Sequence, residues 1–246
     1  MKIGIILQTR MGSTRLPGKV LMKADENNLM LDYSISQLRN CQQSDEIIVA
    51  TSNLERDDVI VNHCEKLNVN VFRGEEEDVL DRHYQCAKKY SLSHIIRIPA
   101  DKPLIDPQIT DSIIKMFISS NFDYIANFGV IKKNNKLILD STYPSGTEVE
   151  MMTFEALEKA WKNAESPDER EHVTSYIYLN SEKFKIKTLD LESNLSNLRW
   201  SLDYENDLKV IRQIIKNIQH RPILMKDIIK FLDKNPEIKN YNQNLK

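Results

Sequence analysis

A cationic loop follows the first apolar segment of the chain, in the stretch QTRMGSTRLPGK at residues 8–19. Arg10 and Arg15 can each offer forked hydrogen-bond donors to phosphate oxygens, and Lys19 supplies a compact positive charge. The loop therefore carries the side chains of a polyphosphate-binding site.

The backbone of this loop suits the same task. Amides around Gly12, Ser13 and Thr14 could face phosphate oxygens, because glycine lets the backbone approach a ligand closely. Gly18-Lys19 is followed by Val20, so the Walker spacing GxxxxGK[ST] is absent, as is the dinucleotide fingerprint GxGxxG. Glycine and proline mark any turn, so a plain surface turn is the alternative.

Two carboxylates follow short apolar segments elsewhere in the chain. Asp101 comes after HIIRI in the motif PADKPL, and Asp203 ends the motif LRWSLD. Mg²⁺ at nucleotide sites is typically held by one or two carboxylates together with substrate phosphate oxygens. Asp101 could instead cap a turn. The two carboxylates combined with the cationic loop favour metal-assisted phosphoryl or nucleotidyl transfer.

These side chains need a common scaffold, and the first half of the chain predicts one. Apolar runs alternate with segments of helical spacing, which predicts strands at 3–7, 46–51, 69–72 and 94–98 and helices at 31–40, 57–67 and 78–90. Apolar runs separated by helices indicate a parallel sheet with crossover connections. Ligands bind beyond the carboxyl ends of such strands. The cationic loop, PADKPL and LRWSLD all fall at such positions, with Asp203 expected at the end of an apolar strand.

The pattern changes after Asn127. Residues 128–150 contain the polar turn KKNNK and short extended pieces, which suggests an antiparallel excursion. Helices are predicted at 153–165, 168–179, 205–218 and 225–234, with a strand at 184–189. We expect a single domain at residues 1–236, with an embedded lobe at about 128–190 and a polar, frayed tail at 237–246.

Composition excludes several classes of protein. The formal net charge is −2, whereas a general nucleic-acid binder is usually basic. No apolar stretch approaches the ~20 residues that span a bilayer, and no signal-peptide pattern is present. Three cysteines lie far apart, which favours neither a disulfide framework nor a zinc site. We expect a cytoplasmic protein that binds neither nucleic acid nor membranes.

A family resemblance rests on motifs spread along the chain. The chain contains, in this order, QTRMGSTRLPGKVL, RGEEEDVLDRHYQCAKKY, IIRIPADKPLIDP, YPSGTEVE, DEREHVTSYI and LRWSLDYENDL. With these motifs it resembles the cytidylyltransferases that activate acidic sugars, the CMP-3-deoxy-manno-octulosonate and CMP-acylneuraminate synthetases. Within that group it is most similar to the spore-coat polysaccharide (SpsF-type) branch. The resemblance extends from residue 1 to about residue 215.

The resemblance implies an α/β, GT-A-like nucleotide-diphospho-sugar transferase fold. Such a fold has a mainly parallel twisted sheet flanked by helices, with a small antiparallel lobe for dimerisation or the acceptor. The resemblance also implies CTP as donor, Mg²⁺ as cofactor and an acidic 2-keto sugar (a ulosonic acid) as acceptor, in surface polysaccharide biosynthesis. The anomeric hydroxyl of the sugar would attack the α-phosphate of CTP, release pyrophosphate and leave a CMP-sugar.

Particular residues take roles from the same resemblance. Arg10, Lys19, Asp101 and Asp203 would be catalytic, with Arg10, Arg15 and Lys19 on the triphosphate and Asp101 and Asp203 on Mg²⁺. Nucleotide-binding residues are expected in the cationic loop and near the neighbouring strand ends: Leu7, Gln8, Arg10, Gly12, Ser13, Arg15, Lys19, Thr51, Ser52, Arg73, Gly74, Asp78 and Arg82.

The acceptor side is expected in YPSGTEVE and DEREHVTSY, through Tyr143, Gly146, Glu148, Glu150, Arg170 and His172. Relatives carry a P-x-G-x-D-x-E pattern, whereas this chain has Glu148 in place of the aspartate, and one methylene moves a carboxylate by roughly 1.5 Å. A lone helical histidine is more often structural, whereas charged clusters like the one around His172 are typical of functional sites, so a structural role and a role on a sugar carboxylate or hydroxyl both stay open. The resemblance further implies a homodimer, through residues 128–180.

Other functions stay open at this point. The residues do not reveal base specificity, so another nucleotide or a non-sugar or sugar-phosphate acceptor would fit. A GT-A glycosyltransferase would share the architecture, but Asp101-Lys102-Pro103 does not supply its usual D-x-D motif. A nucleotide sensor without turnover is a third alternative, and the presence of Lys19, Asp101 and Asp203 argues against it.

Overall fold

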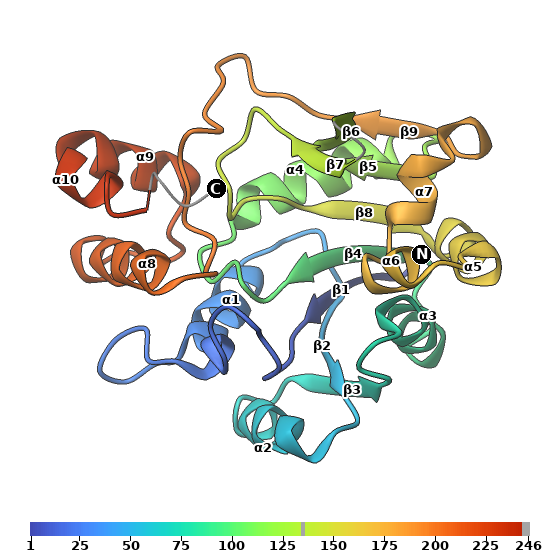
Figure 1. The fold of residues 1–246 in the computed structure, drawn as a ribbon, viewed down its shortest axis with the longest axis horizontal. Coiled ribbons are helices and arrows are strands. Elements are labelled where there is room, and N and C mark those ends of the chain that lie inside the picture. Colours follow the sequence, from blue (N-terminus) through green and yellow to red (C-terminus); the bar gives the residue numbers. More distant parts are fainter. Residues whose placement is uncertain (134–135, 243–246) are drawn as a thin grey trace.

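A seven-stranded mixed sheet forms the centre of the computed structural model, which describes residues 1–133 and 136–242. The sheet has the spatial order β3-β2-β1-β4-β8-β5-β9 (Figure 1). Strands β1 to β4 pair in parallel, and β8 runs antiparallel to both of its neighbours. The seven strands are β1 (Ile3–Gln8), β2 (Glu46–Ser52), β3 (Asn70–Gly74), β4 (His94–Pro99), β5 (Tyr124–Ala126), β8 (Glu150–Thr153) and β9 (Ile186–Thr188). The parallel half confirms the prediction.

Helices connect and cover these strands. Asp78 and Asp106 cap α3 and α4 by accepting backbone N–H groups of Asp81 and Gln108, as their positions before helical segments suggest. The helices are α1 (Met30–Leu38), α2 (Asp58–Lys66), α3 (Val79–Lys89), α4 (Pro107–Ile118), α5 (Phe154–Asn163), α6 (Pro167–Glu171), α7 (Ser175–Leu179), α8 (Glu205–Asn217), α9 (Met225–Lys234) and α10 (Pro236–Lys239). Short 3₁₀ turns lie at Lys19–Leu21, Glu55–Asp57 and Ser181–Lys183.

Both faces of the sheet are buried. Successive side chains of a strand point to opposite faces. In β1, Ile5 and Leu7 pack into a cluster with α1, α2 and α4, whereas Ile6 packs into a second cluster with α3, α5 and α7. This two-sided burial explains why β1 is an almost continuous apolar run.

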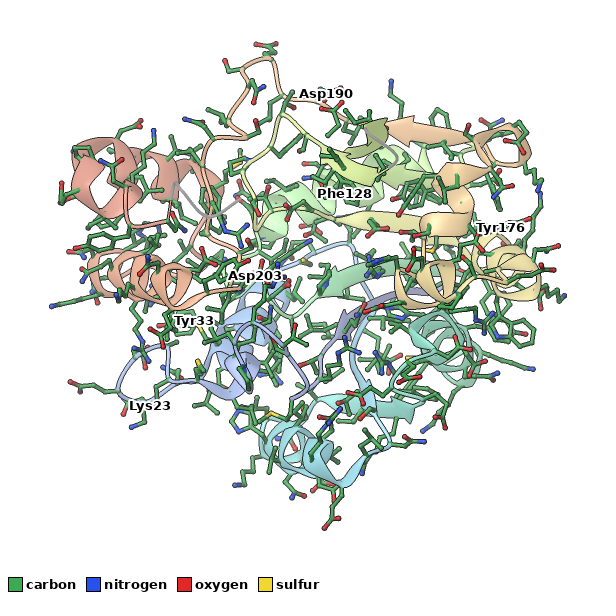
Figure 2. All side chains as sticks on the ribbon, in the orientation of Figure 1. Lys23, Tyr33, Phe128, Tyr176, Asp190 and Asp203 are labelled. Carbon is green, nitrogen blue, oxygen red and sulfur yellow. The ribbon has the colours of Figure 1, made fainter. Side chains whose placement is uncertain are left out.

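A third apolar cluster joins the C-terminal helices to the carboxyl side of the sheet. Trp200 and Leu202 pack there with α8, α9 and α10 and with the start of α1. Because the cluster anchors the segment between β9 and α8, it brings Asp203 close to the loops that follow β1 and β4 (Figure 2).

A separate two-stranded antiparallel sheet consists of β6 (Gly129–Lys133) and β7 (Lys136–Asp140). This hairpin confirms the predicted antiparallel excursion. Strands β8 and β9, which also fall within residues 128–190, belong to the main sheet.

Three expectations about local structure are wrong. Residues 168–179 form two short helices, α6 and α7, because Val173 between them has a left-handed backbone with φ of 59°. LRWSLD is not a strand: its one sheet-like contact is an isolated bridge between Arg199 and Ser145. The described part of the C-terminal tail is not frayed, because α10 buries Ile238 and Asn242 is 3% exposed.

No helix in residues 1–133 and 136–242 is both long and apolar enough to cross a membrane.

Candidate functional site

The cationic loop is held in place by a buried carboxylate. Asp57 accepts the backbone N–H of Met11 at 2.8 Å and the hydroxyl groups of Thr51 and Ser52 at 2.9 and 2.5 Å. Burial alone would raise the pKa of Asp57, but these hydrogen bonds outweigh it and hold the pKa below its ordinary value of 3.8. Asp57 therefore stays ionised and ties the loop to the end of β2.

The turn that ends the loop requires glycine. Gly18 has φ of 68°, in the left-handed region that side chains with a Cβ rarely adopt. Its N–H bonds to the carbonyl of Met11 at 3.1 Å, which closes the loop. The 3₁₀ turn at Lys19–Leu21 follows directly, so Gly18 sets the direction of the Lys19 side chain.

Lys19 brings the two predicted metal-binding carboxylates together. Its Nζ lies 3.3 Å from Asp101 Oδ2 and 3.0 Å from Asp203 Oδ1, and it donates to the carbonyl of Leu202 at 2.7 Å. The backbone N–H of Leu202 in turn bonds to the carbonyl of Asp101 at 2.7 Å. The loop after β4 and the segment before α8 thus meet at Lys19. The structure brings Lys19, Asp101 and Asp203 together, as expected from the sequence.

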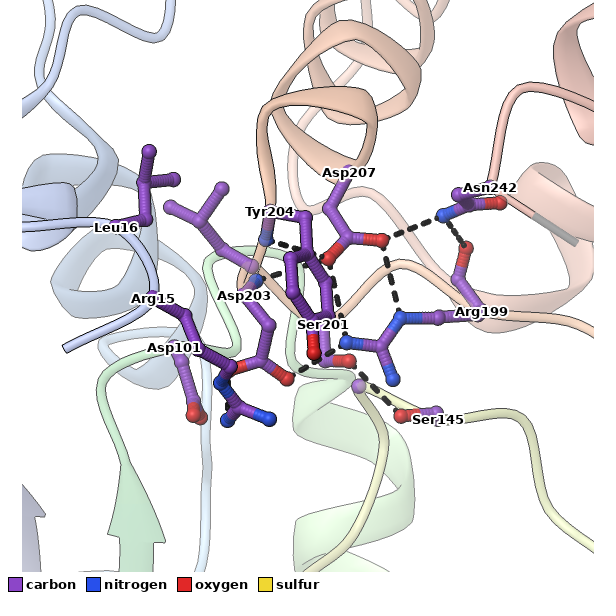
Figure 3. A network of polar contacts seen from close by, with 12 residues as sticks. Arg15, Leu16, Asp101, Ser145, Arg199, Ser201, Asp203, Tyr204, Asp207 and Asn242 are labelled. Carbon is purple, nitrogen blue, oxygen red and sulfur yellow. Dashed lines mark hydrogen bonds and ion pairs between the residues drawn. The ribbon is translucent and has the colours of Figure 1, made fainter. Parts of the chain in front are cut away.

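Asp203 is the most strongly paired acid of the site. Oδ1 accepts from Arg15 at 2.7 Å as well as from Lys19, and Oδ2 accepts from Arg199 at 2.6 Å (Figure 3). Burial raises the pKa of Asp203, but the charges of Lys19, Arg199 and Arg15 outweigh it and keep the pKa below 3.8. Asp203 is therefore an anion at neutral pH.

A cavity of about 300 Å³ opens beside this cluster, at the carboxyl ends of β1 and β4. Asp203 does not line the cavity, but it forms ion pairs with Lys19 and Arg15, which do. Arg10 forms a long ion pair, with its Nη2 3.5 Å from Glu171 Oε1. The predicted residues that line the cavity are Gln8, Arg10, Gly12, Ser13, Arg15, Lys19 and Asp101.

The other predicted nucleotide-binding residues lie behind or beside this wall. Leu7 is buried in the core, and Thr51 and Ser52 are buried around Asp57. Arg73 binds the carbonyls of Ser52 and Leu54, and the carbonyl of Gly74 accepts the N–H of Asn53. Thr51 and Ser52 thus support the β1 loop through Asp57, whereas Arg73 and Gly74 bind the backbone that follows β2.

Asp78 and Arg82 come from α3. Asp78 caps the helix and pairs with Arg170 at 2.5 Å, which links α3 to α6. Arg82 is fully buried and donates to the carbonyl of Glu75 at 3.0 Å. Burial lowers the pKa of Arg82 to about 10.

A larger cavity of about 800 Å³ adjoins the first one at Pro99, which lines both. Glu148, Glu150 and His172 of the predicted acceptor set line it. Tyr143, Gly146 and Arg170 do not: Arg170 pairs with Asp78, and Gly146 lies against Trp200 with φ of 108°. The structure thus brings together half of the acceptor set and gives the rest other contacts.

Arg97 and Lys102, which line this larger cavity, are paired with glutamates. Arg97 lies 2.5 Å from Glu150, and Lys102 lies 3.2 Å from Glu148. Glu148 also accepts the N–H of Gly146 at 2.9 Å, so its longer side chain reaches backbone as well as Lys102. Every lysine and arginine among the described lining residues therefore has a glutamate partner.

The donor set fits a magnesium ion. Asp101 and Asp203 present carboxylate oxygens to one and the same ammonium group, that of Lys19, so a cation at this place would meet both. Residues 1–133 and 136–242 contain no group of three or more His, Cys, Asp or Glu side chains suited to a metal. Two carboxylates completed by phosphate oxygens and water are a common ligand set for Mg²⁺.

Sequence reasoning missed Asp57, Arg199 and Asp207. Arg199 donates to Asp203 Oδ2 at 2.6 Å, and Asp207 accepts the backbone N–H of Asp203 at 2.9 Å. A signal was present, because Arg199, Asp203 and Asp207 recur at intervals of four residues in LRWSLDYEND. Asp57 had no such signal, because its role depends on the fold around it.

Comparison with known proteins finds a matching family model and related chains. A family model described as "Cytidylyltransferase" matches residues 4–224. The spore coat polysaccharide biosynthesis protein SpsF of Bacillus subtilis is 30% identical over 94% of this chain and 94% of its own length.

Solved structures show the same fold. A cytidylyltransferase from Leptospira borgpetersenii superposes with a TM-score of 0.89 at 30% identity, covering 100% of this chain and 98% of that one. A CMP:2-keto-3-deoxy-manno-octonic acid synthetase complexed with CTP superposes with a TM-score of 0.66 at 16% identity, covering 88% and 99%.

Proposed function

The chain belongs to the cytidylyltransferase family, and from this we propose that it transfers CMP from CTP to an acidic 2-keto sugar and releases pyrophosphate. One observation carries the proposal: the cations of the β1 loop and the carboxylates Asp101 and Asp203 converge on Lys19 beside a cavity. Membership of this family favours nucleotidyl transfer over the glycosyl transfer that a GT-A-like fold would also allow.

The triphosphate of CTP would lie along the β1 loop. Arg10, Arg15 and Lys19 line the smaller cavity and would neutralise the phosphates. Charge builds up on the departing pyrophosphate as the bond from the α-phosphate to its β-side oxygen breaks, so fixed cations there stabilise the transition state. When CTP binds, its phosphate oxygens would replace the Asp203 carboxylate as the partners of Arg15 and Lys19.

We propose Asp101 and Asp203 as the residues that hold Mg²⁺. A magnesium ion bound there would stabilise the negative charge on the phosphate oxygens. Asp203 remains ionised near neutral pH because Lys19, Arg199 and Arg15 surround it. Asp101, with a side chain 27% exposed, lies on the open side of the pair.

The acceptor would occupy the larger cavity, which meets the smaller one at Pro99. Its anomeric hydroxyl would attack the α-phosphate from there. His172 in the wall of the larger cavity is the group that we propose for the sugar carboxylate. Glu148 and Glu150 would accept hydrogen bonds from sugar hydroxyl groups.

A neutral sugar is the second candidate acceptor. Arg97 and Lys102, the cations in the described wall of the larger cavity, are already paired with Glu150 and Glu148. An acceptor without a carboxylate would leave these ion pairs intact.

Product analysis tests both candidates. The protein is incubated with CTP, Mg²⁺ and either a panel of ulosonic acids, matched neutral sugars or sugar 1-phosphates, and products are identified by mass spectrometry. A CMP-ulosonate with equimolar pyrophosphate supports the proposal. A CMP conjugate of a neutral sugar alone, or a CDP-sugar from a sugar 1-phosphate, would overturn the acidic acceptor. Binding of CTP without any turnover would indicate a sensor.

We also propose a homodimer, formed through the β6–β7 hairpin and α7. Ile131, Ile138, Leu139 and Leu179 are between 42% and 51% exposed there. Exposed apolar side chains grouped on one lobe are typical of a protein interface.

A further inference from the structure

The C-terminal segment contacts the network around Asp203. Asn242 is 3% exposed, although it lies near the end of the chain. Its Nδ2 donates to Asp207 Oδ1 at 2.8 Å and to the carbonyl of Arg199 at 3.2 Å (Figure 3). α10 carries the segment to this place, because Ile238 packs into the apolar cluster of α8 and α9.

Asp207 distributes its two oxygens over this network. Oδ1 accepts from Asn242 and from Arg199 Nε at 3.0 Å. Oδ2 accepts the backbone N–H groups of Asp203 and Tyr204, both at 2.9 Å, and Arg199 Nη2 at 3.2 Å. Asp207 is fully buried, so water does not compete for these bonds.

Arg199 connects Asp207 to Asp203. Its guanidinium group is fixed by Asp207 on one side and donates through Nη2 to Asp203 Oδ2 at 2.6 Å. The other oxygen of Asp203, Oδ1, faces Lys19 and Arg15. Arg199 therefore holds one carboxylate oxygen away from the cavity and leaves the second one directed toward the triphosphate-binding cations.

We propose that Asn242 is a positioning residue for nucleotidyl transfer, because it fixes Asp207 and thereby holds Arg199 against Asp203. The inference rests on the proposed function, in which Asp203 acts on the Mg²⁺ of bound CTP. Without the Asn242 amide, Asp207 Oδ1 keeps Arg199 Nε as its donor, so the carboxylate that orients the Arg199 guanidinium group is held less firmly. Groups that orient a metal ligand in this way commonly change metal affinity or activity by about 10–100-fold.

The chain offers a matched control and an isosteric variant. Asn240→Ala removes an exposed amide from the same segment and should behave as the wild type. Asn242→Ala removes both hydrogen bonds. Asn242→Asp keeps the shape of the side chain but replaces the donating amide by an anion beside Asp207.

The experiment compares the affinity for CTP with and without Mg²⁺, measured by calorimetry in the absence of acceptor, with thermal unfolding of each variant in parallel. We expect Asn242→Ala and Asn242→Asp to bind CTP with excess Mg²⁺ about 10-fold more weakly. Their affinity for CTP in EDTA should equal that of the wild type, because Arg10, Arg15 and Lys19 are unchanged. A purely structural role would instead lower both affinities together.

Several results would overturn the inference. Wild-type affinity in Asn242→Ala would do so, and recovery in Asn242→Asp would show that the side chain only fills space. If the Asn242 variants do not fold, Arg199→Lys, which keeps the charge but loses the fork, must show the same selective loss. A wild-type protein that binds no CTP would refute the proposed function first, and this inference with it, whereas tight wild-type binding with unaffected Asn242 variants refutes the inference alone.

Discussion

Lys19 Nζ lies 3.0 Å from Asp203 Oδ1, so a cation of the first loop neutralises a carboxylate that is 184 residues distant in sequence. The same ammonium group lies 3.3 Å from Asp101. Lys19 therefore joins the loop proposed to bind the triphosphate to both carboxylates proposed for Mg²⁺. In the proposed binding mode, CTP would redistribute these contacts, because its phosphate oxygens would compete for the lysine and a metal ion would compete for the acids.

Neutralising either carboxylate should abolish most of the activity. We expect Asp101→Asn and Asp203→Asn each to lower kcat by on the order of 100-fold, since fixed charges at a phosphoryl centre contribute mainly in the transition state. Pyrophosphate release with saturating CTP and Mg²⁺ measures the loss. Asp233→Asn, an exposed acid on α9, is the control. Near-normal kcat in both variants, with intact circular dichroism, would remove the metal assignment.

Acid should weaken the fold through Asp57. Its pKa is held below 3.8 in the folded protein, so the folded state binds fewer protons than the unfolded state as the pH falls. Its contribution to stability is therefore present above about pH 4 and is lost as the pH drops through the lowered pKa. Urea unfolding at pH 6, 4 and 3 measures this dependence.

The matched variant for this test is Asp57→Asn. It should lower the free energy of unfolding at pH 6 by about 1–3 kcal/mol, because the donors of Ser52 and Met11 lose a charged acceptor. The difference from the wild type should shrink toward pH 3. An equal difference at all three pH values would show that the charge of Asp57 does not stabilise the fold.

Shortening the side chain of Glu148 should weaken binding of the acceptor and leave binding of CTP unchanged. Glu148→Asp withdraws the carboxylate by roughly 1.5 Å and breaks its contacts with Lys102 and the N–H of Gly146. We expect the KM for the acceptor to rise about 10-fold, as for one lost charged hydrogen bond, with the KM for CTP unchanged. Steady-state kinetics with each substrate varied in turn separates the two. Glu155→Asp on α5 is the control, and a matching rise in the KM for CTP would place Glu148 outside the acceptor site.

The exposed apolar side chains on the lobe formed by the β6–β7 hairpin and α7 predict a homodimer. Leu139→Glu introduces a charge at an exposed apolar position and should convert a dimer into a monomer in light scattering coupled to gel filtration. Leu54→Glu, an exposed leucine outside the lobe, should leave the dimer intact. A wild-type monomer, or a dimer in which Leu54 matters and Leu139 does not, would contradict the proposed interface.

Local pattern was enough to predict much of the fold. The β1 segment IGIIL is apolar on both faces, and the helical spacing around Leu80 and Tyr84 is regular, so the parallel half of the sheet followed from periodicity. The caps at Asp78 and Asp106 are equally local, because each acts within three residues of its own position. Residue types in the first loop and in PADKPL predicted an anion site beside carboxylates.

Other features depend on contacts between distant segments, which no local pattern encodes. The break at Val173 divides a segment of regular helical spacing into α6 and α7. β8 enters the sheet antiparallel between β4 and β5, where hydrogen-bonding partners and buried space are available. Asp203 was expected at the end of a strand, but Trp200 and Leu202 place it by packing against the C-terminal helices.

The site, like the fold, depends partly on residue types and partly on contacts that form only when the chain folds. Charge and residue type were enough to select Lys19, Asp101 and Asp203 as candidate residues, because the sign of the charge and the polar atoms of a side chain follow from the residue type. The distances between them, the buried support from Asp57 and the contact of Asn242 with Asp207 exist only once the chain has folded. Tertiary packing sets these relations because it brings together groups that are separated by tens to hundreds of residues along the chain.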